Sequence, residues 1–349
     1  MKEFLYSPLT LTIGRQELHF GNDMIIGDPD TNNAVTTASP FNGSGTGLRD
    51  PDLSARKAFD AIRATLNYDV MSNPLVVDVV IAQVKNTTFG NRDDENLYGV
   101  NVNYELNKKT TLEGYWWERS RGKVNTAAGT ASNKSDRTDV YGARIVNQSI
   151  KNLTAQVEAA MQLGNVNTSS TITQRRRAWA TEAFLTYDLK DVKKVGKYKP
   201  TATALFAFFS GNKDNSGNKT NKAWDPMYEN QKCGDLANAL LNQSNIMLTG
   251  GILTAKPVDD VTLKGEYYAY WWDKVFQQGG TAQTILTGET LTMTDGKFVG
   301  QEIDLTATYD YTEDVQFALM GGMFMPGDSF DSINRNTATE VIGSMKVTF

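Results

Sequence analysis

Charged side chains that alternate with apolar ones are the residues of this chain best suited to bind a ligand. A guanidinium can hold a carboxylate through two parallel hydrogen bonds, which suits uronate sugars and organic acids. If the apolar face of each segment meets lipid, the charged face lines an interior, because an Arg or Lys at the bilayer midplane costs about 2–4 kcal/mol. The alternation predicts these inward basic residues: Arg63, Arg119, Arg121, Arg144, Lys264 and Lys346.

Arg15 is a further candidate binding residue, but its position in the alternating pattern points it toward the apolar face. It shares the parity of the apolar residues Leu9, Leu11 and Ile13. An inward Arg15 therefore requires a β-bulge near Gly14, and otherwise the residue must lie beyond the lipid band.

Acidic residues share the predicted inward face and outnumber the bases. They are Glu105, Glu113, Glu158, Glu182, Glu266, Glu302, Asp304, Asp310 and Glu340. One interpretation is a conduit in which Arg63, Arg119, Arg121 and Arg144 attract carboxylated solutes. The other is that bases and acids pair across strands and fill a polar interior. The excess of acids means that anion selectivity does not follow from the sequence.

Aromatic residues gather near the ends of two similar segments, 112–117 and 263–272. They favour an aromatic belt at the membrane interface. A sharper hypothesis has the inward members stack on sugar rings, and both hold if adjacent Trp residues face opposite ways. The inward set is Tyr115, Trp117, Tyr268, Tyr270 and Trp272.

Catalysis and metal binding find little support in the sequence. His19 is the only histidine and Cys233 the only cysteine, with no nucleophile motif beside either. The Asp-Pro-Asp sequences at 28–30 and 50–52 lack EF-hand spacing, which favours solvated loops over a calcium site. We therefore expect no enzyme, no metal and no cofactor.

Period-2 alternation runs through about 14 segments, each near the length of a strand that crosses a bilayer. Residues 97–106, 153–163 and 303–311 show it most clearly. The segments are 9–18, 58–69, 75–86, 96–107, 110–121, 138–149, 153–165, 177–190, 199–211, 245–256, 260–273, 299–312, 315–326 and 338–349.

Connections between these segments alternate between short turns and long polar loops, as in outer-membrane barrels. The longest loops are 20–57, 122–137, 212–244 and 274–298. Two stretches compete with this plan. Residues 55–63 have helical propensity, but their alternating continuation favours a strand from about Phe59. Residues 235–241 predict a short helix inside an external loop. No run of 18 apolar residues predicts a transmembrane helix.

The fold class is therefore all-β: an antiparallel up-and-down transmembrane β-barrel of about 14 strands, with residues 1–349 as one domain. The first residues do not resemble a signal peptide, which an outer-membrane protein needs for secretion. The formal net charge of −5 gives no basic footprint for nucleic acid. Expected partners are outer-membrane lipid, lipopolysaccharide, and the barrel-assembly machinery through the terminal Phe349. The run Arg175–Arg177 either contacts lipopolysaccharide phosphates or is an ordinary charged rim.

Three short elements resemble the alginate-export family of outer-membrane barrels. They are Gly14-Arg15-Gln16 followed by Phe20-Gly21, then the stretch from Arg56 to Arg63, and Trp224-Asp225-Pro226-Met227-Tyr228. Ala61 departs from the usual Gly of the second element. The resemblance implies an 18-stranded plan, so four strands before residue 9 would complete it; a closed 14-stranded barrel is the alternative.

The sequence as a whole indicates an outer-membrane channel. Hydrophilic, acidic or polyuronate solutes are the expected substrates. The alternative is a structural or interaction barrel whose loops close the pore and serve adhesion or a complex.

Overall fold

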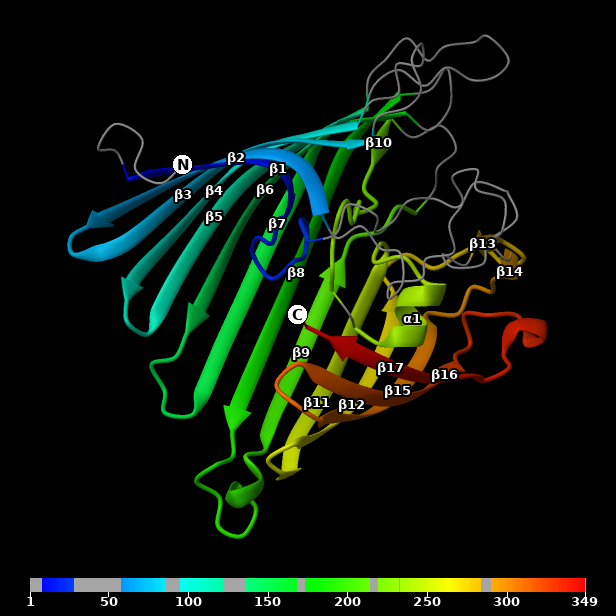
Figure 1. Cartoon of the computed structure of the whole chain (residues 1–349). Coiled ribbons are helices and arrows are strands. Elements are labelled where there is room, and N and C mark those ends of the chain that lie inside the picture. The colour runs from blue at the N-terminus through cyan, green and yellow to red at the C-terminus, as the bar shows by residue number, and fades with distance from the viewer. Residues whose placement is uncertain are drawn as a thin grey trace.

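Antiparallel strands dominate the computed structural model, which describes residues 8–27, 58–85, 95–121, 136–167, 173–213, 219–231, 233–283 and 290–348. Fourteen strands follow one another in a single curled sheet, with each long strand beside its neighbour in the chain (Figure 1). This confirms the predicted up-and-down order. The strands are β1 (Leu9–Glu17), β2 (Ala58–Val70), β3 (Asn73–Lys85), β4 (Glu95–Asn107), β5 (Thr110–Arg121), β6 (Asp136–Asn147), β7 (Leu153–Asn167), β8 (Thr173–Asp188), β9 (Thr201–Phe209), β11 (Ile246–Val258), β12 (Val261–Trp272), β15 (Phe298–Asp310), β16 (Val315–Pro326) and β17 (Ala338–Val347).

Three short strands that the alternation did not predict lie within the long loops. β10 (Thr220–Asn221) pairs in parallel with the first residues of β8, while β13 (Thr281–Gln283) and β14 (Thr290–Thr292) pair with each other. β8 also begins four residues earlier than expected. β10, β13 and β14 have only two or three residues each, so an alternating pattern cannot be recognised in them.

Alternation of the side chains separates two faces of the sheet. On β7, Val157 and Met161 are exposed while Glu158 and Gln162 are fully buried. The same division continues along the sheet: apolar side chains predominate on the outer face, and buried polar and charged side chains lie on the inner face. A continuous apolar outer face of this kind is what a bilayer covers.

Helices are few and short in the described residues. α1 (Asp235–Leu240) confirms the predicted helix, and η2 (Gly196–Tyr198) and η3 (Ser332–Asn334) are single 3₁₀ turns. The stretch with competing helical propensity is a strand from Ala58. No described helix is long and apolar enough to cross a membrane.

Two loop segments fold into the concave side of the sheet, and we call them together the inner plug: residues 18–27 and residues 223–231 with 233–245 (Figure 1). Backbone hydrogen bonds join them, from Gly27 N to Tyr228 O at 2.7 Å and from Asn230 N to Asp23 O at 3.0 Å. Buried apolar residues at their contact include Met24, Ile25 and Ile26. The predicted short helix therefore lies inside the curl of the sheet and not in an external loop.

Candidate functional site

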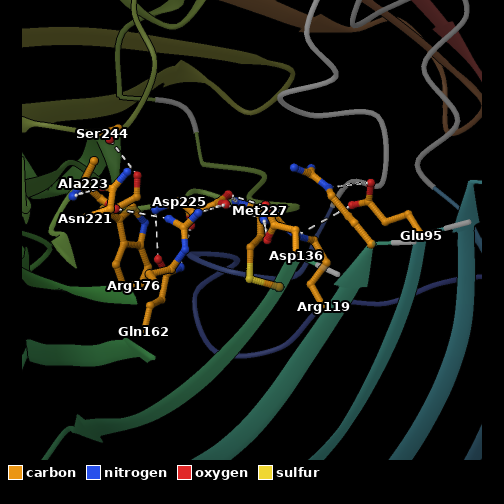
Figure 2. Close-up of polar contacts among 12 residues, drawn as sticks. Glu95, Arg119, Asp136, Gln162, Arg176, Asn221, Ala223, Asp225, Met227 and Ser244 are labelled. Atoms are coloured by element: carbon orange, nitrogen blue, oxygen red, sulfur yellow. Dashed lines mark hydrogen bonds and ion pairs between the residues drawn. The ribbon is translucent and has the colours of Figure 1, made fainter. Parts of the chain in front are cut away.

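A carboxylate of the inner plug sits among arginines of the wall (Figure 2). Both guanidinium nitrogens NH1 and NH2 of Arg119, on β5, donate to Asp225, with NH1 2.9 Å from Oδ1. From β8, Arg176 places NH2 3.2 Å from Asp225 Oδ2. The contact with Arg119 has the paired geometry in which Arg holds carboxylates.

Backbone contacts fix Asp225 in place between these arginines. Gln162 of β7 accepts from Asp225 N at 2.9 Å and donates to Asp225 O at 2.6 Å. Although burial alone would raise the pKa of the Asp225 carboxyl, the charges of Arg119 and Arg176 lower it well below its usual range. Asp225 is therefore ionised at any ordinary pH.

A cavity of about 260 Å³ adjoins this cluster. The guanidinium-bearing residues Arg119, Arg121 and Arg176 line it together with the amides of Asn221 and Asn242. A cavity with three guanidiniums and two amides on its walls can bind further anionic or hydroxylated groups beside Asp225.

Glu95 links the arginine cluster to Tyr228, in the second segment of the inner plug. It accepts from Arg121 Nε at 2.9 Å and from the Tyr228 hydroxyl at 2.6 Å. Burial, and then the charge of Glu95, raise the pKa of Tyr228 well above its ordinary value, so its hydroxyl keeps the proton that it donates.

Glutamates of the wall hold the tip of the other plug segment. Gly21 N donates to Glu113 at 2.9 Å and Asn22 N to Glu158 at 2.8 Å. The side-chain amide of Asn22 donates to Glu182 at 2.8 Å. Glu113, Arg144, Glu158 and Glu182 are register partners on four successive strands, which places this charged row directly under the tip.

A third contact joins α1 to the wall near β15. Leu236 N and Ala237 N both donate to Glu302 at 2.8 Å, and the Tyr270 hydroxyl donates to the carbonyl of Cys233 at 2.6 Å. Among the described residues, Glu302, Asp304 and Glu340 bring carboxylate oxygens within 4.8 Å of one another and are the group that could hold a cation.

Most of the residues predicted to line the interior do face inward, and there they form ion pairs with other residues of the same chain. Arg63 Nε lies 2.7 Å from Asp78, Arg144 NH1 lies 3.1 Å from Glu113, and Lys264 Nζ lies 2.6 Å from Glu266. The four proposed solute-attracting arginines, Arg63, Arg119, Arg121 and Arg144, thus each contact a carboxylate. This pattern matches the alternative in which interior charges pair with one another.

The aromatic candidates also face inward and contact protein. Trp117 is completely buried against Phe20, with ring centroids 4.7 Å apart, and Trp272 packs edge-on against Phe276. Tyr115 donates to Glu158 at 2.6 Å. Among these rings Trp117 packs directly against the inner plug, and any stacking on sugars stays a prediction.

Arg15 is the one candidate that the structure places elsewhere. The pairing of β1 with β2 runs through Gly14 without a shift, so no bulge turns Arg15 inward. Its Nε lies 2.9 Å from Asp60, and both side chains are more than half exposed on the outer face. The expectation that Arg15 lines the interior is wrong because its parity with Ile13 is kept.

Comparison with known proteins identifies the family of this chain. A model of the family described as alginate export matches residues 48–344. The chain belongs to the alginate export family. No curated protein matches it.

Solved structures with a similar arrangement include the ferric-catecholate import receptor Fiu from E. coli K12. The open form has a TM-score of 0.37 and 14% sequence identity over 83% of this chain and 55% of that one. The closed form has a TM-score of 0.35 and 14% identity over 76% of this chain and 48% of that one. The chain spans about half the length of that receptor, and a likeness this low does not bear on function.

The three elements that resemble the alginate export family meet in the structure. Arg15 of the first pairs with Asp60 of the second, and Phe59 of the second packs edge-on against Tyr228 of the third, at 5.7 Å between centroids. Phe20 of the first lies under the Arg63 guanidinium at 5.2 Å. The motif residues therefore attach the plug to the first strands of the sheet.

Sequence reasoning missed the roles of Asp225, Arg176 and Gln162. Asp225 was noted only within a family-like element of a loop, and Arg176 only as part of a basic run. The usable signal was the pair of large apolar residues Trp224 and Tyr228 in an otherwise polar loop. The predictions for the Asp-Pro-Asp sequences and for Phe349 concern positions outside the described residues.

Proposed function

We propose that this member of the alginate export family is an outer-membrane channel for carboxylated solutes, polyuronate chains included. The observation that carries the proposal is the carboxylate of Asp225 held by Arg119 and Arg176 beside a cavity with a third guanidinium. The interior already binds one carboxylate in paired geometry. A solute carboxylate has the same chemistry and would use the same donors when the plug moves.

The family match supports an outer-membrane channel or export role in general terms. Support for the membrane comes from the apolar outer face, and support for the solute class comes from the arginines. We propose no catalytic step, and the proposed partners are lipid on the outer face and an anionic solute inside.

A second candidate function rests on the inner plug itself. Two loop segments fill the concave side and use the same interior charges that a solute would need. That favours a barrel closed by its own loops, which serves adhesion or a complex. The two functions differ in whether ions pass.

Planar-bilayer recording in a salt gradient tests the channel. We expect a measurable conductance whose reversal potential favours anions, and a weaker preference in Arg121→Gln, because Arg121 lines the cavity. Arg137→Gln is the matched control, since Arg137 pairs with Glu118 and Asp139 and does not line the cavity. A selectivity unchanged by Arg121→Gln would contradict the carboxylate proposal, and inserted protein without conductance would favour the closed barrel.

A further inference from the structure

Two arginines face outward at the long-loop end of β8, and two exposed lysines lie beside them. Arg175 and Arg177 are exposed, while Arg176 between them points inward to Asp225. β10 continues the wall beside this end, with Thr220 as the register partner of Arg175. Lys219 and Lys222 flank β10 and are also exposed. We call Arg175, Arg177, Lys219 and Lys222 the rim patch.

Aromatic side chains mark the level just below the rim patch. Trp179 is the next outward residue on β8 after Arg177, and it stacks on Phe208 with centroids 4.4 Å apart. Outward residues in register with it on the neighbouring strands include Met161 and Tyr141. Since outward residues on a strand are about 6.6 Å apart, the two arginines lie roughly 7 and 13 Å beyond the Trp179 level. Tryptophan belts mark the membrane–water interface.

Carboxylates do not neutralise this patch within the part of the chain that the structure describes. Arg137, two strands away on the same face, pairs with Glu118 at 2.8 Å and with Asp139 at 2.9 Å. The described residues provide no comparable ion pair for any of the four rim-patch cations. Arg137 therefore has its charge balanced by described carboxylates, whereas the rim-patch cations have no such partner among the described residues.

We propose that the rim patch binds the phosphates of an outer-leaflet glycolipid, the lipid A part of lipopolysaccharide. The cations lie where a headgroup would sit, and Trp179 and Phe208 lie where its acyl chains begin. Arginine is suited to phosphate by its paired donors. The inference rests on the outer-membrane placement proposed above, but not on the solute or on the pore.

Direct binding of purified lipid A to the full chain in detergent tests the proposal. We expect bisphosphorylated lipid A to bind at least tenfold more tightly than dephosphorylated lipid A, and Arg175→Gln/Arg177→Gln to remove that difference. The matched control is Lys193→Gln/Lys194→Gln, which removes two exposed charges from the turn at the opposite end of β8. Circular dichroism first establishes that each variant keeps the β-sheet spectrum.

The inference is overturned by a rim variant that binds as the wild type does, by equal binding of dephosphorylated lipid A, or by equal loss in the control. Inorganic phosphate at the same concentration is a further arm, and tight binding of free phosphate would also contradict a lipid site. Conductance separates this inference from the proposed function. The rim variant is expected to keep the wild-type reversal potential, because its side chains lie on the outer face.

Discussion

At the scale of single residues, one residue, Asp225, joins three strands of the wall to the inner plug. Asp225 contacts Arg119 on β5 and Arg176 on β8, and its backbone is held by Gln162 on β7. A buried ion pair gives little net stability compared with apolar packing, but removal of one partner leaves the other charge uncompensated. Loss of Asp225 should therefore release the plug and leave the wall intact.

Asp225→Asn tests this. We expect the variant to weaken docking of the plug by about 3–5 kcal/mol, because two buried guanidiniums lose their counter-ion. Cys233 is the natural reporter, as the only cysteine and a buried residue of the plug. Burial, and then the charge of Glu182, raise the pKa of its thiol, so it reacts only when the plug opens.

The measurement is the rate of alkylation of Cys233 in the folded protein, expected to rise about 100-fold or more in Asp225→Asn. Asp191→Asn is the matched control, because Asp191 forms an exposed ion pair with Lys151 in a turn. Equal labelling rates in Asp225→Asn and wild type would show that the ion pair does not hold the plug.

The same carboxylate has a defined dependence on pH. The folded-state pKa of Asp225 is lowered, so its contribution is complete above the unfolded pKa of about 3.9 and is lost as pH falls toward the folded value. We expect the stability difference between wild type and Asp225→Asn to be constant from pH 8 to 5 and to shrink below about pH 4. Guanidinium unfolding in detergent measures it.

A difference that instead fell between pH 8 and 6 would implicate another group.

At the scale of elements, the strands were predictable and the plug was not. Each long strand carries its own signal, since alternation of apolar and polar residues needs no partner elsewhere in the chain. All 14 predicted segments are strands, with ends shifted by a few residues. The plug depends on contacts such as that of Asp225 with Arg119, 106 residues away, and on loops without a period. The sequence therefore predicts which charged side chains point inward, but it does not predict which residue each of them pairs with.

Gly21 tests how the tip of the first plug segment is held. Its φ of +65° suits glycine, and a Cβ there would lie 2.5 Å from a carboxylate oxygen of Glu158. We expect Gly21→Ala to lower the unfolding free energy by more than the roughly 1–2 kcal/mol cost of the left-handed backbone alone, since the turn must also move away from Glu113 and Glu158.

Gly279→Ala is the matched control for this prediction, because Gly279 has a φ of +75° and open space where its Cβ would lie. Guanidinium midpoints of the two variants give the comparison. Equal losses of unfolding free energy in the two variants would mean that the Glu158 side chain moves aside at no energetic cost. The contacts of Glu158 would then not hold the tip of the plug in place.

At the scale of the whole molecule, polar and apolar groups lie opposite to where a water-soluble protein places them. Its concave side buries arginines, glutamates and tyrosine hydroxyls, while its convex side exposes leucine, isoleucine and valine. In water such an outer face would drive association, because large exposed apolar patches are unfavourable. In lipid the same face is satisfied, while the interior charges pair with one another across the wall and with the plug. The two faces together are consistent only with lipid outside and polar contents inside.

Leu253→Arg separates these two surroundings. Leu253 lies at the middle of β11, with 63% of its surface exposed on the convex side. If lipid covers it, arginine there should lower the unfolding free energy in vesicles by about 2–4 kcal/mol. Ile150→Arg is the control, since Ile150 is equally exposed but lies in the turn between β6 and β7, where water is available. On a sheet that faced water, an exposed Leu→Arg change would be close to neutral. Equal stability of Leu253→Arg and Ile150→Arg in vesicles would therefore contradict the membrane placement of this face, whatever the pore conducts.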